Sequence, residues 1–334
     1  MSYGAQAKVG FARQTNPGSY VIATTAPTSY HAMGFVSHDI GLEKDEVISQ
    51  NLNGQFEQGA SYSGASKVNG TIEFEATPRN LLTALGLAAT HAPATVNSGS
   101  IRSWTFLPNT SDYDSSYIKA PWSMYSQFAD SNSADLFYDI QAGQIDFVIS
   151  QGQFTRGRIQ IVGGNRVATG VGSANIVPDI ADAGRLFPWN VASISYGGAA
   201  LQTASDITVS LNENIDGLYT TNGSLAPYKY TRTGFREVTV NGTFYMVDRS
   251  MLNNFTSETQ ARLLITLVST IAAVQSGYYN TLTIDVPQLK VTAFKPPVSG
   301  PGEVSVPFTG RGVSDPSSRY ALQFTLINTR QIDL

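Results

Sequence analysis

The stretch "VNGTIEFEATPRNLL", Val68 to Leu82, decides the fold, because the chain uses a similar phrase again in "VNGTFYMVDRSMLNNF", Val240 to Phe255. Apolar and polar residues alternate at the start of the first stretch, which is typical of a half-buried strand. Thr77-Pro78 then supplies a helix N-cap followed by proline at the first helical position. We therefore predict a strand that continues through Gly70, marked there by a bulge or close packing, and then a short helix.

Two further pairs of segments occur in the same order in both halves of the chain. Ile145-Asp146-Phe147 is echoed by Ile284-Asp285-Val286, and the strand-like segment from Gly157 is echoed by the one from Gly302. Ordered self-similarity of this kind indicates a tandem duplication of a strand–strand–helix–hairpin module. A passage rich in Gly, Ala and Ser from Gly163 marks the boundary. The predicted organisation is a first module over 1–164, a linker over 165–180 and a second module over 181–334.

The composition excludes several classes of function. Only 14% of the residues are charged, against about a quarter in ordinary domains, which suits a protein that hides surface in an assembly. The net charge of −4 and the lack of a basic run argue against tight binding of nucleic acid. The chain has no cysteine, which excludes disulfides, zinc–thiolate sites and thiol catalysis and fits synthesis in a cytosol.

The most apolar run, Leu263 to Val274, is too short to span a bilayer, and the N-terminus lacks a signal-peptide pattern. We predict no membrane insertion and expect a buried or half-buried helix here. Ser257 with Gln260 three residues later forms a capping-box pattern that would open this helix. Its buried stripe, spaced as on one helix face, is predicted to be Leu263, Leu264, Leu267, Val268 and Ile271.

Residues suited to catalysis are few. The three histidines, His31, His38 and His91, have neither metal-ligand spacing nor a neighbouring nucleophile motif. Glu73 and Glu75 share one strand face at about 7 Å, a separation found in inverting glycosidases. A polar strand face toward water explains this pair better, because acids two residues apart are common on exposed strands.

The acidic segment Gly41 to Gln50 has oxygen ligands for calcium, but its spacing differs from that of an EF-hand loop. A solvated loop is the better interpretation. We therefore predict no enzymatic activity, no metal and no cofactor.

Several segments resemble the tail tube proteins of tailed bacteriophages. They are the N-terminal "KVGFARQTNPGS", then "VNGTIEFEATPRNLLTALG" and "QAGQIDFVISQGQFTRGRIQIVGG", and finally "NTLTIDVPQLKVTAFKPPVSGPGEVSVPFTGRGVSD" with "YALQFTLIN". The resemblance covers most of the chain and rests on structural rather than chemical patterns. Residues 104–136 match nothing in it and are predicted to be an insertion.

The resemblance implies a mainly β fold of two tandem similar modules, each a β-sandwich or half-barrel with one flanking α-helix. It implies a structural virion protein that polymerises into stacked rings, which form the tail tube and conduct the genome into the host. The duplicated form implies three chains per ring, with six as the alternative. The implied partners are further copies of the chain, the tail terminator, tail-tip and tape-measure proteins, and double-stranded DNA in transient passage. The implied location is the virion tail, after assembly in the host cytoplasm.

Two sets of surface residues follow from the strand pattern combined with this resemblance. The polar residues that alternate with the apolar ones are expected to face the bore, and they are Asp39, Glu43, Asn69, Thr71, Glu73, Glu75, Asp206, Thr208, Asn241 and Thr243. The polar segments Glu43 to Ser66 and Asn212 to Thr233 are expected to contact neighbouring rings. The residues singled out on these segments are Glu46, Asn53, Gln55, Phe56, Tyr62, Tyr219, Asn222 and Tyr228.

Two other functions stay open at this point. One is another ring-forming conduit or a tail-tip protein with the same fold, which would form single rings rather than long tubes. The other is a carbohydrate-binding or carbohydrate-active β-protein, which would need an aromatic platform beside the acids. The aromatic candidates for such a platform are Tyr228, Tyr230, Phe235 and Tyr245.

Overall fold

The computed structural model describes most of the chain. The described residues are 7–14, 18, 30–50, 60–91, 94–107, 121–127, 134–167, 185–201, 203–221, 223–245, 250–275, 278–294 and 304–329.

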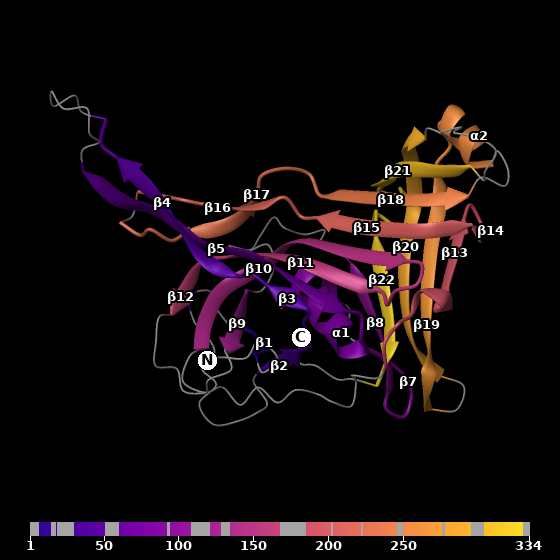
Figure 1. The fold of residues 1–334 in the computed structure, drawn as a ribbon, viewed down its shortest axis with the longest axis horizontal. Helices are drawn as coiled ribbons and strands as arrows, with labels where there is room; N and C mark the ends of the chain where they lie inside the picture. Colours follow the sequence, from indigo (N-terminus) through magenta and orange to yellow (C-terminus); the bar gives the residue numbers. More distant parts are fainter. Residues whose placement is uncertain are drawn as a thin grey trace.

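A large antiparallel sheet, called the main sheet below, dominates the fold. Its strand order is β4–β5–β11–β10–β15–β18–β21–β20. In that order the bounds are Gly41–Ile48, Ser61–Glu75, Arg156–Gly163, Ala134–Ser150, Ala204–Asn212, Glu237–Tyr245, Ser305–Val313 and Tyr278–Phe294. The short β3, Ser37–His38, also pairs with β5. In Figure 1 the central strands of this sheet, β11, β10, β15 and β18, run across the picture one above another, while β4 and β5 run obliquely at its left side.

The two longest main-sheet strands, β10 and β20, each continue into a second sheet. The N-terminal part of β10 lies between β9 and β12, and β9 continues to β1 and β2. The bounds of these strands are Trp122–Gln127 (β9), Asn165–Val167 (β12), Lys8–Arg13 (β1) and His31–Met33 (β2).

The N-terminal part of β20 lies between β19 and β22, which Figure 1 shows running nearly perpendicular to the main sheet. Beyond β19 lie β13 and β14, and beyond β22 lie β8, β6 and β7. The bounds are Ala261–Gln275 (β19), Gln323–Asn328 (β22), Ala192–Tyr196 (β13), Ala199–Ala200 (β14), Ile101–Leu107 (β8), Thr90–His91 (β6) and Thr95–Ser98 (β7). A 3₁₀ turn, Trp189–Val191, precedes β13.

The repeated Val-Asn-Gly-Thr phrase lies at the same place in two main-sheet strands. As predicted, β5 continues through Gly70, whose φ is +149°. A Cβ atom at Gly70 would lie 2.5 Å from Ile40 Cα and 2.9 Å from the carbonyl oxygen of Asp39. At Gly242 in β18, a Cβ atom would lie 2.6 Å from the carbonyl oxygen of Asp206. Both glycines therefore allow the neighbouring strand to approach at an equivalent point, which is the close packing that the sequence predicted.

Helix α1, Pro78–Ala88, forms where the sequence predicts it. The hydroxyl of Thr77 accepts a hydrogen bond from the backbone N–H of Asn80 at 3.2 Å, so Thr77 is the N-cap. Leu81, Leu82 and Leu85 are fully buried in the main core. The Asn80 side chain donates to the carbonyl oxygens of Gly34 and Glu75 and ties the helix to both segments.

The second predicted helix is wrong. Helix α2 spans Ser250–Thr256, and Ser257 lies at its C-terminal end, where its hydroxyl bonds to the carbonyl oxygen of Asn253. The segment from Ala261 onward is β19. Leu263, Leu267 and the intervening Ile265 are all buried at period two, so the apolar residues mark one face of a strand. The predicted helical stripe, which also included Leu264, Val268 and Ile271, does not form.

The acidic segment is also different from its prediction. The segment expected to be a solvated loop forms β4, whose side chains are largely exposed. The strand forms because β5 supplies a ladder along it, from Gly41 opposite Asn69 to Ile48 opposite Ser61, with one register shift between Lys44 and Glu46. Of the predicted linker 165–180, residues 165–167 form β12 and the remainder lies outside the described residues.

Candidate assembly surfaces

The main sheet has one apolar face and one polar face. Residues such as Ile72, Phe74 and Val240 are fully buried on the apolar face. The opposite face carries nine of the ten residues predicted to face a bore, and Asp39 lies in the connection between β3 and β4. The strand register places Glu75, Thr208 and Asn241 in one row across the sheet. The alternation in the sequence therefore identified one continuous polar surface.

Charges of opposite sign face each other on this polar surface. Glu75 lies opposite Arg156, and Arg158 lies between Glu73 and Asp146 in the register. Side chains directly opposite in an antiparallel pair have Cβ atoms about 5 Å apart. The two arginines and Asp146 were missed as bore candidates, although the alternating exposure of the β11 sequence RGRIQIVG could have identified them.

The interpretation of Glu73 and Glu75 as catalytic carboxylates gains nothing from this geometry. Each glutamate faces an arginine across the strand pair, and their strand lies in a flat row of polar side chains. Among the described residues no group of three His, Asp or Glu side chains is arranged to hold a metal ion.

The four aromatic residues considered for a sugar platform occupy different surroundings. Tyr230 is buried, and its hydroxyl donates to the carbonyl oxygen of Gly163. Tyr245 is partly exposed on β18, whereas Tyr228 and Phe235 are 61% and 89% exposed on separate loops. The buried Tyr230 is therefore a packing residue and takes no part in an exposed platform.

Two hairpins extend the main sheet at one side. The first joins β4 to β5 and projects away from the body in Figure 1. The second is formed by β16, Ile215–Leu218, and β17, Lys229–Arg232, within the connection from β15 to β18. The backbone N–H of Ser66 in the first hairpin donates to the carbonyl oxygen of Leu225 in the second at 2.7 Å. The hydroxyl of Tyr219 also donates to the carbonyl oxygen of Ser66 at 3.4 Å.

The residues predicted to contact neighbouring rings lie on these two hairpins. Glu46 and Tyr62 are exposed on the first, and Tyr219 and Tyr228 are exposed on the second. The remaining predicted residues, Asn53, Gln55, Phe56 and Asn222, lie outside the described residues.

A buried ion triad closes the base of the second hairpin. Glu213, directly after β15, is 1% exposed and accepts from Arg232 at 2.7 Å and from Arg236 at 3.0 Å. Its backbone N–H donates to the carbonyl oxygen of Gly143 in β10 at 2.8 Å. The triad therefore fixes the hairpin to the junction between β10 and β15.

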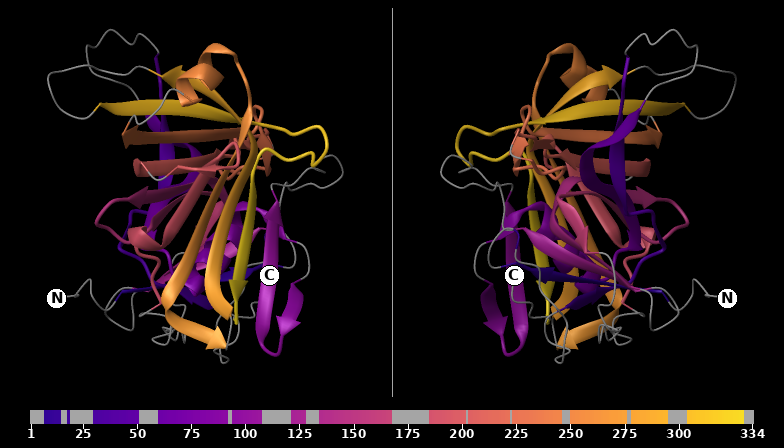
Figure 2. Two further views of the ribbon diagram at one scale, coloured as in Figure 1. Left: turned by 90° about the vertical axis from the view of Figure 1, so that its right-hand side faces the viewer. Right: turned by 90° about the vertical axis from the view of Figure 1, so that its left-hand side faces the viewer.

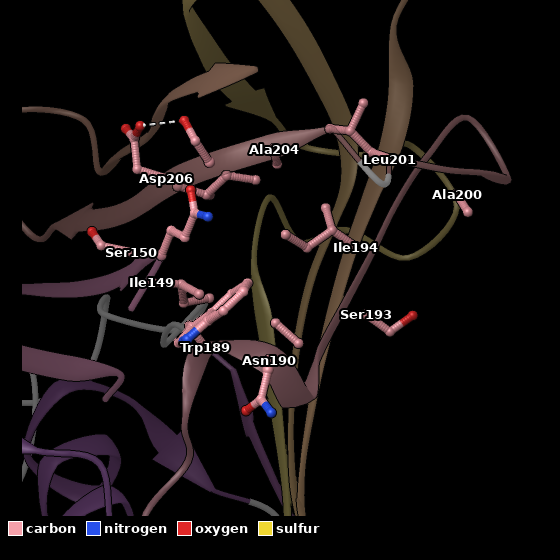
Figure 3. A pocket seen from close by; sticks show the side chains of 14 residues that line it. Ile149, Ser150, Trp189, Asn190, Ser193, Ile194, Ala200, Leu201, Ala204 and Asp206 are labelled. Atoms are coloured by element: carbon pink, nitrogen blue, oxygen red, sulfur yellow. Dashed lines mark hydrogen bonds between the residues drawn. The ribbon is translucent and has the colours of Figure 1, made fainter. Parts of the chain in front are cut away.

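A cavity of ≈ 350 Å³ opens at the other end of that junction (Figure 3). Its walls come from β10, β15, β13 and the turn that carries Trp189, and it is lined mainly by small, apolar and amide side chains. Asp206 is the carboxylate among its described lining residues, and it accepts a hydrogen bond from Ser205 at 2.9 Å. A single carboxylate in such a lining does not form an acid–base pair.

One ionisable group at the edge of the main sheet, opposite the buried Ile72, has a shifted pKa. Burial lowers the pKa of His38 below its usual value, and the neighbouring Asp39 partly opposes this shift. His38 Nε2 lies 3.3 Å from the hydroxyl of Ser126 in β9. This histidine therefore connects the sheet that contains β1, β2, β9 and β12 to the edge of the main sheet.

The surfaces described above are extended strand edges, polar faces and hairpins, which are features of subunits that assemble. Within the part of the chain that the structure describes, no helix is long and apolar enough to cross a membrane. No curated protein matches the chain. The profile of the phage tail tube proteins matches residues 4–312, which is nearly the whole chain. The chain therefore belongs to the phage tail tube protein family, and it is a structural component of the virion tail that assembles with other copies and other tail proteins.

Proposed function

We propose that three copies of this chain form one ring of the tail tube, with each copy filling two of six equivalent positions. The observation that carries this proposal is the order of the main sheet. Its first four strands, β4–β5–β11–β10, are followed by β15–β18–β21–β20, in which each strand has the counterpart expected from a duplication.

The correspondence extends to elements outside the main sheet. In chain order, the proposed pairs are β1 and β13, β4 and β15, β5 and β18, α1 and α2, β9 and β19, β10 and β20, β11 and β21, and β12 and β22. The strands left without a counterpart would then be β2, β3 and β6 to β8 in the first module and β14 in the second, while β16 and β17 lie in the connection that corresponds to the β4–β5 hairpin. The predicted insertion at 104–136 includes β9, for which this scheme has a counterpart.

The register supports the same alignment. Val68 lies opposite Gly163 in the first module, and the equivalent Val240 lies opposite Gly310 in the second. This alignment shifts the echo between Gly157 and Gly302 by two residues, which keeps every side chain on its predicted face. The echo between Ile145 and Ile284 is not part of it, because Ile145 lies opposite Ile159 of β11, whereas Ile284 lies opposite Ile265 of β19 and Phe324 of β22.

The pairing of β10 with β15 inside the chain indicates how the corresponding strands of two copies would pair. In it β10 and β15 pair from Gln144 opposite Asn212 to Ser150 opposite Asp206. The counterpart of β15 at the other end of the sheet is β4, whose outer edge has no strand partner among the described residues. The counterpart of β10 is the C-terminal end of β20. Joining β4 of one copy to β20 of the next would close the sheet into a ring and remove both exposed edges.

In such a ring the polar face would line the bore and α1 would lie on the outer side. Arginines on this face alternate with glutamates and aspartates, so the local charge is close to balanced. A balanced surface binds few phosphates, which suits the passage of double-stranded DNA without retention. This placement concerns the ten residues from Asp39 to Thr243 named above, together with Arg156 and Arg158.

The tips of the two hairpins would contact the neighbouring ring, and stacked rings would form the conduit for genome ejection. The end rings would meet the tail terminator and tail-tip proteins, and the tape-measure protein would occupy the bore during assembly in the host cytoplasm. The proposed role needs no catalysis, cofactor or metal.

The test is electron microscopy of the purified protein, with the mass per ring measured independently. We expect rings or tubes with a central hole, apparent six-fold symmetry and three chains per ring. A ring of six chains would contradict the two-position arrangement while leaving a conduit role intact. Protein that stays monomeric at high concentration, and also fails to form tubes when purified tail-tip complex is added as an initiator, would contradict the role itself.

A further inference from the structure

A groove at the β21 end of the main sheet is rich in positive charge. It has a cavity volume of ≈ 710 Å³ and is bounded by the β17–β18 connection, β21 and the turn after β21. The cationic side chains among its lining residues are Arg232, Arg236, Lys290, Arg311 and Arg319. Four of them already have acidic partners just outside the groove: Glu213 binds Arg232 and Arg236, Glu258 binds Lys290, and Glu237 lies 3.8 Å from Arg311. The lining residues that the structure describes include no acidic side chain, and Phe235 at its edge is 89% exposed.

The surface of the first module that corresponds to this groove is covered by the β16–β17 hairpin. Under the alignment of Val68 with Val240, Ser66 corresponds to Val238, and Gly163 corresponds to Gly310 beside Arg311. The β16–β17 hairpin covers Ser66 and Gly163 through the hydrogen bonds from Tyr219 and Tyr230 and the bond to Leu225. Ile215 and Tyr230 also pack against Val162.

If the groove is covered in the same way, the covering element is the hairpin of the first module that corresponds to β16–β17. The β16–β17 hairpin lies in the connection between β15 and β18, and the equivalent connection in the first module is the β4–β5 hairpin. Figure 1 and Figure 2 show that the β4–β5 hairpin projects away from the body of its own chain. The groove of the same copy lies at the opposite end of the main sheet, so the hairpin that fits it must come from another copy.

The chemistry of the β4–β5 hairpin complements that of the groove. Glu43, Asp45 and Glu46 are exposed on β4, where they outnumber Lys44. Val47 and Tyr62 are 58% and 70% exposed at the outer part of the hairpin. An acidic edge with exposed apolar side chains matches a basic groove with an exposed aromatic ring.

We propose that the β4–β5 hairpin of one copy docks in this groove of the next copy within the same ring. Asp45 and Glu46 face Arg311 and Arg319, and the outer part of the hairpin covers Phe235. The docking rests on the ring proposed above and specifies which surfaces of two copies meet. It uses the paired strands of the hairpin as far as Val47 and Tyr62 and leaves the connection between them for the neighbouring ring.

The first experiment reverses the charges on each side separately and then together. Asp45→Lys with Glu46→Lys changes the hairpin, and Arg311→Glu with Arg319→Glu changes the groove. Each double variant places like charges at every junction and should raise the critical concentration for assembly at least about tenfold. The quadruple variant restores opposite charges at every junction and should assemble within about threefold of the parent.

Controls separate docking from folding. Arg311→Lys with Arg319→Lys keeps the charge and should assemble like the parent. Circular dichroism melts should show that all variants fold, since the four residues are exposed. If the parent forms rings while either reversal assembles normally, or while the quadruple variant is not rescued, the docking is wrong and the ring proposal stands.

A second experiment gives a result even if the parent forms no rings, which would contradict the ring proposal. The chain has no cysteine, so Glu46→Cys and Arg319→Cys can be combined in one chain and treated with a short bismaleimide. Docking predicts linear and closed covalent multimers, whereas either cysteine alone should give dimers at most. Monomers alone from the combined variant would overturn the docking.

Discussion

Replacing Gly70 by alanine tests why the repeated phrase contains a glycine. A Cβ atom at this position would lie 2.5 Å from Ile40 Cα and 2.8 Å from the Ile40 backbone nitrogen. Contacts below 3.0 Å with backbone atoms cannot be relieved by a side-chain rotation, so the start of β4 must move. The φ of +149° adds a second penalty, because a residue with a Cβ atom rarely adopts it.

The two penalties set the expected magnitude. A backbone conformation that only glycine adopts readily costs about 1–3 kcal/mol, and overpacking in a close-packed site costs about 1–3 kcal/mol more. Gly70→Ala should therefore lower the free energy of unfolding by about 2–6 kcal/mol. Gly242→Ala meets a backbone oxygen at 2.6 Å and the ring of Phe308 at 2.8 Å, without a positive φ, so only the overpacking penalty applies, about 1–3 kcal/mol.

Denaturant unfolding of the monomer measures both changes, with Gly41→Ala as the matched control. Gly41 lies at the start of β4, and a Cβ atom there would have nothing within 4 Å of it, so this variant should stay within about 0.5 kcal/mol of the parent. The reasoning fails if Gly70→Ala is as stable as Gly41→Ala, or if Gly242→Ala is the more destabilised of the two repeat variants.

Three further predictions concern charged groups. Glu213→Gln breaks both ion pairs of a fully buried carboxylate, including that with Arg232, and should lower the free energy of unfolding by about 3 kcal/mol. Asp285→Asn removes the two-bond pair with Arg262 and should cost about 1–2 kcal/mol in the same unfolding assay, discounted because Arg262 is largely exposed. Since the pKa of His38 is lowered by burial, the unfolded state takes up a proton first as the pH falls below about 6.5, and stability should decline there. His38→Gln should flatten this part of the stability-versus-pH curve, and an unchanged curve would contradict the assignment.

The sequence predicted the main sheet well because alternation and turn chemistry are local signals. The strand from Val68, helix α1 and the hairpin around Gln151-Gly152 follow directly from residue spacing and capping. Helix α2 and β19 were harder to distinguish. Leucines at Leu263, Leu264 and Leu267 fit both a helical and a strand period, and the ladder that β20 offers along this segment decides in favour of the strand.

The polar surface was predicted in outline and incompletely in detail. Alternation placed Glu73 and Glu75 on the correct face, but it could not show that Arg156 and Arg158 lie opposite them, because strand partnership depends on the tertiary arrangement. The groove could not be predicted from the sequence for the same reason. Its cations come from segments separated by many residues, such as Arg236 and Arg319, and only the fold brings them together.

The proposed duplication would also account for where the charges are concentrated. At the junction inside the chain, β15 meets β10 with Asp206, Thr208, Ser210 and Asn212 on its polar side, so one of these four side chains is charged. The equivalent strand β4, which would meet another copy, carries Glu43 and a run of charge as far as Glu46. Two strands of one chain are held at a high effective concentration for each other, so they pair without a separate means of recognition. A junction between copies must be found by diffusion and must reject wrong pairings, and complementary charge serves both purposes. Under the duplication and ring proposals the two junctions would share one geometry, and only the external junction would require charges for recognition.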